Sequence, residues 1–294
     1  DAETNKQLRT LSKSPSDYRA RLPHGYRRIS FSPVAFSPDG KLIAIANGAV
    51  VRFWNPSTGD YVGELKHEGN ASSNVSSMAF SSDGTLLAVG TYGGDVKIWV
   101  AASQKLFSKL PDKDKHADRI YALAFSPNGK SLVFNNKDAI EWWDRSLTKK
   151  LRQLEFGRTI TDRADEYATA QAAAFSPDST LLAVAYNDGD AVIYDSADGR
   201  ERAVLLCQKK ATSYLDFSPD GRLLLTGGDD GTLKLWDIAT LRELLTLRWH
   251  TNKIMAAAFS PDGQKLATLD DDHNLRVWHA PTDAVEAVAR REGP

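Results

Sequence analysis

The sequence predicts an all-β fold of the propeller class, and three observations lead to this prediction. A string that reads Phe-Ser-Pro-Asp-Gly at Phe36 returns with small changes at five further phenylalanines, Phe80, Phe125, Phe175, Phe217 and Phe259. Successive phenylalanines are 42 to 50 residues apart, a period typical of repeat architectures. Each repeat also contains short apolar segments separated by turn residues, a pattern typical of antiparallel strands.

The fifth repeat shows the expected order of elements most clearly. Its string Ser218-Pro219-Asp220-Gly221 fits a type I turn, because proline presets φ at the second position and glycine tolerates a positive φ at the end. A second turn, rich in glycine, covers residues 227–231. The four strands around these turns are predicted over residues 213–217, 222–226, 232–236 and 243–247. Each repeat therefore predicts one four-stranded antiparallel meander.

A sheet of four strands cannot bury both of its faces alone. Stacking the repeats face to face around an axis buries these faces and protects most strand edges, which favours a propeller over a linear array. We expect one domain over residues 1–294, with six repeats in residues 30–294 and a stray outer strand plus a lead-in segment in residues 1–29. Residues 6–11 and 284–289 both read as an outer strand, so a six- or seven-bladed ring and a piece of a longer array stay open, and we favour the longer array.

A tryptophan recurs at the end of the predicted third strands. The strings Val96-Lys-Ile-Trp99, Leu233-Lys-Leu-Trp236 and Leu275-Arg-Val-Trp278 stand at the same place in their repeats. Together with the Phe-Ser-Pro-Asp-Gly strings, they resemble the WD40 repeat over nearly the whole chain. The resemblance implies a WD40-type β-propeller with six recognisable four-stranded blades. The regular copies also look like WD40 arrays of bacterial multidomain proteins, which implies a sensor or docking module of a larger protein.

The resemblance further implies a buried set of hydrogen-bonded side chains, which is complete only in the sixth repeat. Its members there are His250, Thr268, Asp272 and Trp278. A hydroxyl, an imidazole and a carboxylate in one repeat could also suggest acyl transfer. However, the threonine lies in mid-strand without a glycine-flanked turn or evident oxyanion donors, which favours a structural role. We therefore predict no catalytic residue and expect the sixth blade to be the most rigid.

The resemblance also places a partner-binding face on two kinds of loop. These are the turns before the third strands and the lead-in loops before the first strands. The residues at these positions are Tyr92, Arg119, Tyr121, Asn187, Asp229, Lys253, Met255 and Asp271. Aromatic residues, arginine and methionine are enriched in the cores of protein interfaces. The alternative interpretation is that these are ordinary exposed loop residues.

The composition bears on partners and location. The 37 lysines and arginines nearly balance the 38 aspartates and glutamates, and no basic stripe is present, so we expect no nucleic-acid partner. No apolar stretch approaches the ~20 residues that span a bilayer, so we expect no membrane partner. The single cysteine, Cys207, allows no internal disulfide and fits a reducing compartment, and we expect a cytoplasmic protein in which this side chain is packed.

Metal and cofactor sites are not expected. The acidic run 270–272 with His273 has consecutive residues that cannot all point inward, so a solvated turn is the better interpretation. No phosphate-binding glycine loop is present in the sequence. We therefore predict a non-enzymatic platform for protein partners. The alternatives are a constitutive structural subunit of a stable complex and a propeller enzyme with chemistry at the channel mouth.

Overall fold

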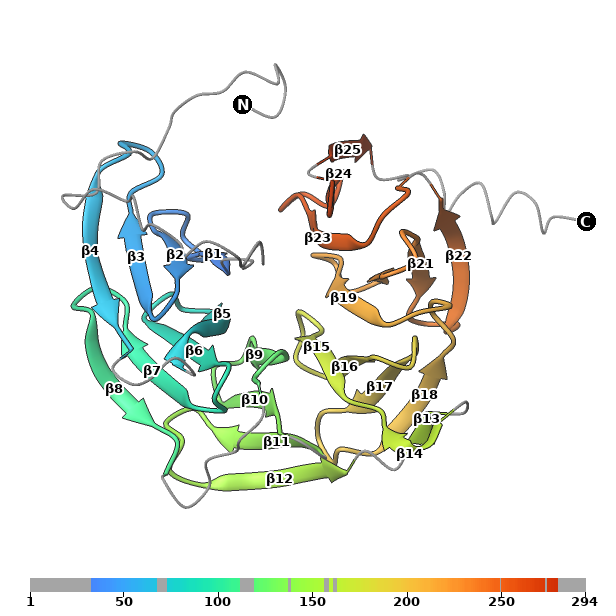
Figure 1. Cartoon of the computed structure of the whole chain (residues 1–294), viewed down its shortest axis with the longest axis horizontal. Helices are drawn as coiled ribbons and strands as arrows, with labels where there is room; N and C mark the ends of the chain where they lie inside the picture. Colours follow the sequence, from blue (N-terminus) through green and yellow to red (C-terminus); the bar gives the residue numbers. More distant parts are fainter. Residues whose placement is uncertain are drawn as a thin grey trace, which may run out of the picture. The chain divides into compact units, whose positions relative to one another are not determined.

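The computed structural model describes residues 33–67, 73–111, 119–136, 139–155, 159–160, 163–248, 250–272 and 274–279. In this part of the chain, strands and turns form the backbone and no α-helix is present (Figure 1). The predicted all-β class is confirmed. The chain divides into two compact units, unit 1 (Asp1–Ile120) and unit 2 (Tyr121–Pro294). No helix among the described residues is long and apolar enough to cross a membrane.

The described part of unit 1 contains two blades, each a four-stranded antiparallel meander in sequential strand order. Blade 1 consists of β1 (Val34–Phe36), β2 (Ile43–Asn47), β3 (Val50–Trp54) and β4 (Tyr61–Lys66). Blade 2 consists of β5 (Val75–Phe80), β6 (Leu86–Thr91), β7 (Val96–Val100) and β8 (Lys105–Lys109).

The described part of unit 2 contains four blades. Blade 3 consists of β9 (Leu123–Phe125), β10 (Ser131–Asn135), β11 (Ala139–Asp144) and β12 (Lys150–Glu155). Blade 4 consists of β15 (Ala170–Phe175), β16 (Leu181–Tyr186), β17 (Ala191–Asp195) and β18 (Glu201–Leu205). Blade 5 consists of β19 (Thr212–Phe217), β20 (Leu223–Gly228), β21 (Leu233–Asp237) and β22 (Arg242–Leu247). Blade 6 shows three strands, β23 (Ile254–Phe259), β24 (Lys265–Asp270) and β25 (Leu275–His279).

One strand pair was not predicted, and two predicted strands lie outside the described residues. Between blades 3 and 4 along the chain, a separate antiparallel pair of strands, β13 (Thr159–Ile160) and β14 (Arg163–Tyr167), is present in addition to the four strands predicted for each repeat. The outer strands predicted over residues 6–11 and 284–289 lie outside the described residues. The choice between a closed ring and a longer array therefore stays a prediction.

The Phe-Ser-Pro-Asp-Gly strings form the turns between the first and second strands. In blade 5, the Ser218 hydroxyl donates to Asp220 at 2.6 Å and accepts the backbone N–H of Leu223 at 2.9 Å. Gly221 ends this turn with a φ of +71°, a conformation that favours glycine. The same contact between the motif serine and the carboxylate or amide two residues later recurs at Ser37, Ser81, Ser126, Ser176 and Ser260. Local hydrogen bonds thus close each of these turns.

Within each unit, consecutive blades pack face to face, and the apolar core lies between them. We call the side of a blade that meets the next blade its forward face, and the opposite side its rear face. The forward face of blade 5 presents Leu233 and Leu235, which belong to one buried cluster with Ile254 and Leu266 on the rear face of blade 6. Equivalent clusters join blades 1 and 2, blades 3 and 4, and blades 4 and 5.

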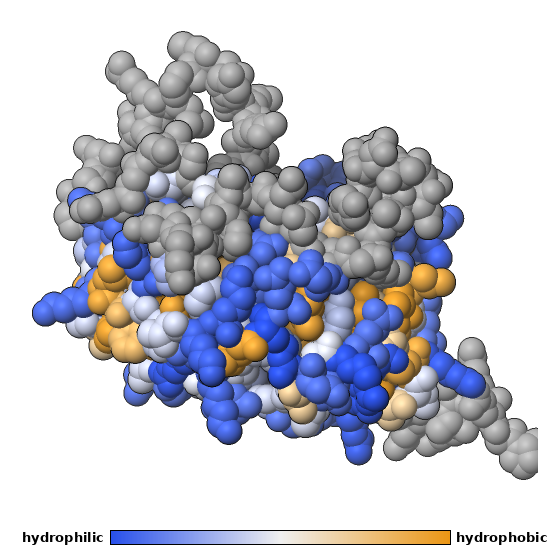
Figure 2. Space-filling model, turned by 90° about the horizontal axis from the view of Figure 1, so that it is seen from below, coloured by the Kyte–Doolittle hydropathy of each residue, from blue (hydrophilic) through white to orange (hydrophobic). Residues whose placement is uncertain are grey.

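The outer strands carry charge. A lysine or arginine lies on the fourth strand of every blade in which that strand is described, at Lys66, Lys105, Lys150, Arg202 and Arg242. Charged side chains on edge strands oppose pairing with the edges of other sheets. Figure 2 shows one side of the molecule, where hydrophilic residues spread over the described surface and smaller apolar patches lie among them.

Candidate functional site

The predicted partner-binding turns share one backbone geometry. The N–H groups of Tyr92, Asn187, Asp229 and Asp271 each donate to the carbonyl of the residue that precedes the first strand of the same blade. These acceptors are Asn74, Thr169, Ala211 and Lys253, at distances of 2.9 to 3.1 Å. Each bond ties the turn before the third strand to the lead-in loop, so in these blades the two predicted loop types form one local surface.

In unit 1 the structure brings Tyr92 and Arg119 together. The guanidinium carbon of Arg119 lies 3.7 Å from the centre of the Tyr92 ring, a cation–π contact between two half-buried side chains. The next residue, Ile120, donates its N–H to the Thr91 carbonyl at 3.0 Å, and its own carbonyl accepts the Ser76 hydroxyl at 2.6 Å. These backbone contacts hold Arg119 against the turn of blade 2.

In unit 2 the lead-in loop of blade 3 presents an exposed aromatic ring. The side chain of Asn135 accepts the backbone N–H groups of Tyr121 and Ala122 at 2.7 and 2.9 Å. The Tyr121 residue is 41% exposed. The buried asparagine therefore fixes the backbone of this loop while the ring faces solvent.

The loops of blades 5 and 6 place two predicted residues in an ion pair. Lys253 Nζ lies 2.7 Å from Asp229 Oδ1, and each side chain is about one-third exposed. Met255 is half-buried and Asp271 is exposed. The Asn187 side chain is used within its own blade, where its Oδ1 accepts the Thr169 N–H at 2.7 Å. Of the predicted face in unit 2, Tyr121 and Asp271 thus have the most accessible side chains.

The buried hydrogen-bond set of blade 6 contains three of its four predicted members. His250 Nε2 lies 2.8 Å from the Thr268 hydroxyl, which also accepts the indole N–H of Trp278 at 3.0 Å. The prediction of Asp272 as the carboxylate was wrong, because the partner of the imidazole is Asp270. His250 Nδ1 lies 2.7 Å from Asp270 Oδ2.

Strand alternation explains this correction. β24 extends to Asp270, so Asp270 and Thr268 point to the same face of the strand and reach one imidazole. Asp272 lies beyond the strand end in an exposed turn, where it accepts the Asn252 side-chain amide. Burial raises the pKa of Asp270, but hydrogen bonds from His250 and Asn274 outweigh it and lower the pKa to about 2.

This arrangement is built for stability. His250, Thr268 and Asp270 are 6%, 1% and 2% exposed, so a substrate has no access to the hydroxyl. Each polar group instead satisfies another in the interior, as buried polar groups require. Whether blade 6 is the most rigid stays a prediction.

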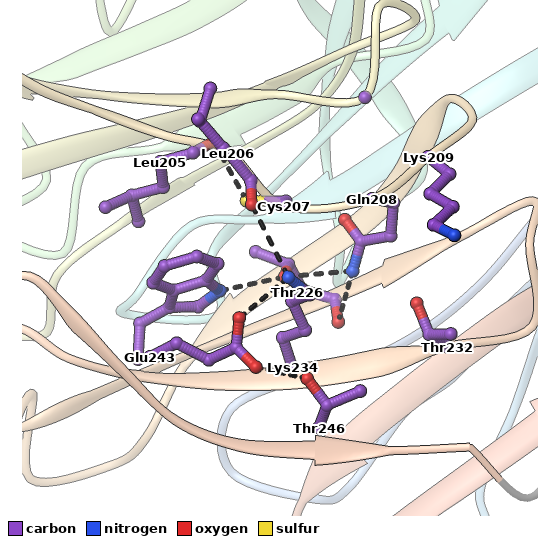
Figure 3. A network of polar contacts seen from close by, with 12 residues as sticks. Leu205, Leu206, Cys207, Gln208, Lys209, Thr226, Thr232, Lys234, Glu243 and Thr246 are labelled. Carbon is purple, nitrogen blue, oxygen red and sulfur yellow. Dashed lines mark hydrogen bonds and ion pairs between the residues drawn. The ribbon is translucent and has the colours of Figure 1, made fainter.

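Blade 5 has an equivalent set that the repeat pattern did not predict, because a glutamine takes the place of the histidine. The Thr226 hydroxyl accepts the indole N–H of Trp236 at 3.0 Å and the Gln208 amide at 3.2 Å (Figure 3). Gln208 Oε1 accepts the Thr212 hydroxyl at 2.7 Å. Gln208 stands 28 residues before its tryptophan, as His250 does before Trp278. This shared spacing was the signal that could have identified the glutamine.

In blades 1, 2 and 3 the equivalent tryptophan indoles have other surroundings. In blade 3, the buried Glu141 accepts the Trp143 indole N–H at 2.7 Å and pairs with Lys150 at 2.5 Å. In blades 1 and 2, the buried indole nitrogens of Trp54 and Trp99 have no hydrogen-bond partner among the described residues. Ile45 and Val89 occupy the register positions of Thr226 there, since each lies two residues after the one that pairs with the tryptophan.

The described part of the chain shows neither a cluster of metal ligands nor a reactive thiol. No group of three or more His, Cys, Asp or Glu side chains there could hold a metal ion. Burial raises the pKa of the Cys207 thiol to about 12, which opposes formation of a nucleophilic thiolate.

A pocket of about 470 Å³ opens in unit 2 among the motif turns of blades 4 and 5, lined in part by Asp178, Arg202 and Asp220.

Comparison with known proteins agrees with this architecture. The family model described as "WD domain, G-beta repeat" matches residues 60–100, 201–237 and 241–279. Each match begins at an outer strand and ends at the third strand of the next blade.

Several curated proteins are similar over about half of this chain. The Periodic tryptophan protein 2 homolog of Schizosaccharomyces pombe is 27% identical over 174 residues, which are 56% of this chain and 19% of the relative. The Meiotic recombination protein rec14 of the same species is 28% identical over 54% of this chain and 48% of its own length. The Small ribosomal subunit protein RACK1y of Oryza sativa subsp. japonica is 29% identical over 54% of this chain and 45% of its own length.

The aligned segments span less than half the length of these three relatives. The likeness therefore concerns the repeats and not any whole relative. The chain therefore contains WD40 repeats in the matched segments, and its described blades share one sequential strand order.

Proposed function

We propose that this protein is a non-enzymatic platform that binds protein partners through its loop face. We define the loop face as Tyr92 and Arg119 in unit 1 and Tyr121, Asn187, Asp229, Lys253, Met255 and Asp271 in unit 2. The observation that carries the proposal is the repeated backbone bond that ties each predicted turn to its lead-in loop. Loops braced in this way lose little conformational freedom on binding, which favours affinity.

The side chains of the loop face support a protein partner. Tyr92 with Arg119, and Tyr121, provide aromatic rings and a guanidinium, which are the residue types found most often among interface hot spots. The ion pair between Lys253 and Asp229 leaves little net charge on that part of the face. A nucleic-acid partner would instead be favoured by a concentration of basic side chains.

Two relatives are named as subunits of larger complexes, which supports a protein partner for this chain. RACK1y is named as a small ribosomal subunit protein, and a relative from Solanum tuberosum is named as a guanine nucleotide-binding protein subunit beta. We extend the proposal to a cytoplasmic sensor or docking module of a larger multidomain protein, with residues 1–294 as one propeller domain. No contact among the described residues favours an enzyme, since the one Thr–His–Asp arrangement is buried.

A capture experiment tests the loop face. The wild-type chain, the double variant Arg119→Ala/Tyr121→Ala and the control variant Leu206→Ala would be immobilised and exposed to lysate of the source cells. Leu206 is 74% exposed and lies outside the loop face, so it controls for loss of any apolar surface residue. We expect one or more proteins captured by the wild type and the control, with binding reduced about tenfold or more in the double variant.

Two results would contradict the proposal. Undiminished capture by the double variant would move the binding site elsewhere on the molecule. Turnover of a small substrate that is lost in a folded His250→Ala variant would show an enzyme.

A further inference from the structure

A pair of backbone carbonyls in the turn after the third strand of blade 4 accepts an arginine from blade 3. The two carbonyls belong to Ser196 and Ala197, which stand two and three residues after Tyr194. They accept the two terminal nitrogens of the Arg152 guanidinium, at 3.2 and 2.7 Å. Arg152 lies on β12, the outer strand of blade 3, so one blade here supplies a cation to the next blade.

Blade 2 occupies the equivalent carbonyls with a neutral group. Ala101 and Ala102 stand two and three residues after Trp99, and both accept the side-chain amide of Gln104 at 3.4 Å. A guanidinium and an amide are both planar groups with N–H donors. The carbonyl pair of this turn is therefore a site for a planar donor.

Blade 5 has the same turn without such a donor. Its carbonyl pair belongs to Ile238 and Ala239, because the Ile238 N–H donates to the Arg222 carbonyl at 2.9 Å as the Ser196 N–H donates to the Thr180 carbonyl at 2.8 Å. Within the described part of the chain, neither carbonyl of the pair accepts a hydrogen bond. Both residues line the pocket of about 470 Å³ between blades 4 and 5, a volume in the range of ligand sites.

The pocket exists because blade 4 has small residues where blade 3 has large ones. In blade 3, Arg152 pairs with Trp142 across the sheet, and its guanidinium carbon lies 5.0 Å from the centre of the indole ring. The register equivalents of this pair in blade 4 are Ala203 and Ile193. The space that an arginine fills between blades 3 and 4 is thus left open between blades 4 and 5.

The lining of the pocket suits an arginine side chain. Ile193, Ile238 and Leu241 offer apolar surface to the methylene stem, which arginine commonly buries while its charged end stays polar. Asp178 and Asp220, which belong to the motif turns of blades 4 and 5, add two carboxylates. Charge-assisted hydrogen bonds to a guanidinium are stronger than those between neutral groups.

Both carboxylates are ionised at neutral pH. The hydrogen bond from the Ser176 hydroxyl is the main cause that lowers the pKa of Asp178. Burial raises the pKa of Asp220, but hydrogen bonds from Ser218 and from the backbone of Arg222 outweigh it and lower the pKa. The pocket therefore offers two negative charges to a cation.

We propose that this pocket binds an arginine side chain of a protein partner. The partner's guanidinium donates to the carbonyls of Ile238 and Ala239, as Arg152 does to the equivalent pair inside the chain. A planar fork can serve two carbonyls at once, which favours arginine over the point charge of lysine. The turns around the pocket lie at the opposite end of the strands from the turns of the loop face, so this is a second contact that does not depend on the first.

Methyl NMR of the whole chain, labelled at isoleucine, tests this inference. The probe is acetyl-arginine amide, and the matched probes are acetyl-citrulline amide, which is neutral with almost the same shape, and acetyl-lysine amide. The Ile193 and Ile238 signals should shift in a saturable way, with a dissociation constant of about 1–10 mM for a single side chain. Citrulline and lysine should each bind at least about fivefold more weakly. Ile98 in unit 1 should not shift.

Two variants and a matched control assign the binding to the pocket. Ala203→Arg restores the internal arginine and should abolish the shifts, because its own side chain then occupies the carbonyl pair. Asp220→Asn should weaken binding about fivefold. Asparagine is compatible with this turn, since Asn128 accepts the motif serine in blade 3. Asp262→Asn removes the matching carboxylate of blade 6, which does not line the pocket, and should bind as the wild type does.

A further variant and the loop-face double variant complete the test. Arg202 also lines the pocket, and its like charge opposes the probe, so Arg202→Ala should bind at least as tightly as the wild type. The loop-face double variant should bind the probe unchanged. Absence of shifts at Ile193 and Ile238 up to about 50 mM acetyl-arginine amide would overturn the proposal. So would equal binding of the citrulline or lysine probe, or a folded Ala203→Arg variant that binds as the wild type does.

Discussion

Thr226→Val is the sharpest test of the hydrogen-bond sets between the strands of a blade. The Thr226 hydroxyl is fully buried and accepts the Trp236 indole N–H at 3.0 Å. Valine has nearly the same shape, so the substitution removes the acceptor without leaving a cavity. A buried donor left without a partner costs about 1–3 kcal/mol. The Gln208 amide keeps a bond to the Thr226 carbonyl at 3.3 Å, so the indole accounts for most of the expected loss.

Urea unfolding measures this loss. We expect the free energy of unfolding to fall by about 1–3 kcal/mol with an unchanged m-value, because the surface exposed on unfolding stays the same. The control is the same substitution in a Trp236→Phe background, where no indole N–H remains. There the cost of Thr226→Val should shrink to about 0.5 kcal/mol or less, since removing both partners is far cheaper than removing one. An equal cost in both backgrounds would refute the role assigned to this hydrogen bond.

Three further predictions follow from the same structure. Val89→Thr offers a hydroxyl to the Trp99 indole N–H, which has no hydrogen-bond partner among the described residues. Its control is Val184→Thr, because blade 4 has Tyr194 where blade 2 has this tryptophan. In urea unfolding, Val89→Thr should lower the free energy of unfolding by about 1 kcal/mol less than Val184→Thr does, and equal losses would contradict this. Burial raises the pKa of Asp216 to about 6, so this carboxyl destabilises the fold as pH rises from about 4 through 6. Asp216→Asn should therefore stabilise the protein by about 1–3 kcal/mol at pH 7 relative to wild type and by much less at pH 4, measured by unfolding at both pH values; a gain that does not depend on pH would contradict it. Gly231→Ala would place Cβ 2.6 Å from the His250 carbonyl oxygen and should lower the stability of the protein by more than about 2 kcal/mol. Gly221 has a similar φ, but a Cβ there would lie 3.4 Å from Pro177, so Gly221→Ala should lower the stability by about 1 kcal/mol. Thermal unfolding compares the two variants, and equal losses would argue against the close approach at Gly231.

The blades were predictable because their pattern is local. Apolar alternation and turn residues recur in each repeat, and every strand of a blade pairs with its neighbour in sequence. The sequence therefore contains both the strands and their order. The β13–β14 pair was missed because its segment has no counterpart in the other repeats.

The polar partners within the blades were less predictable, because they depend on where a strand ends. A shift of two residues moved the carboxylate partner of His250 from the predicted Asp272 to Asp270, since only the latter lies on β24. In blade 3, Glu141 reaches the indole from the strand of the tryptophan itself, a solution that the repeat pattern does not contain.

The motif turns have a consequence for how such a chain can change over generations. Each turn is closed by a serine and residues no more than five positions away, and it needs nothing from a distant part of the chain for those bonds. A coding segment for one repeat can therefore be duplicated or deleted with its turn chemistry complete. Only the two blade contacts at the junction must be matched anew, so selection can adjust the number of repeats without redesigning the unit.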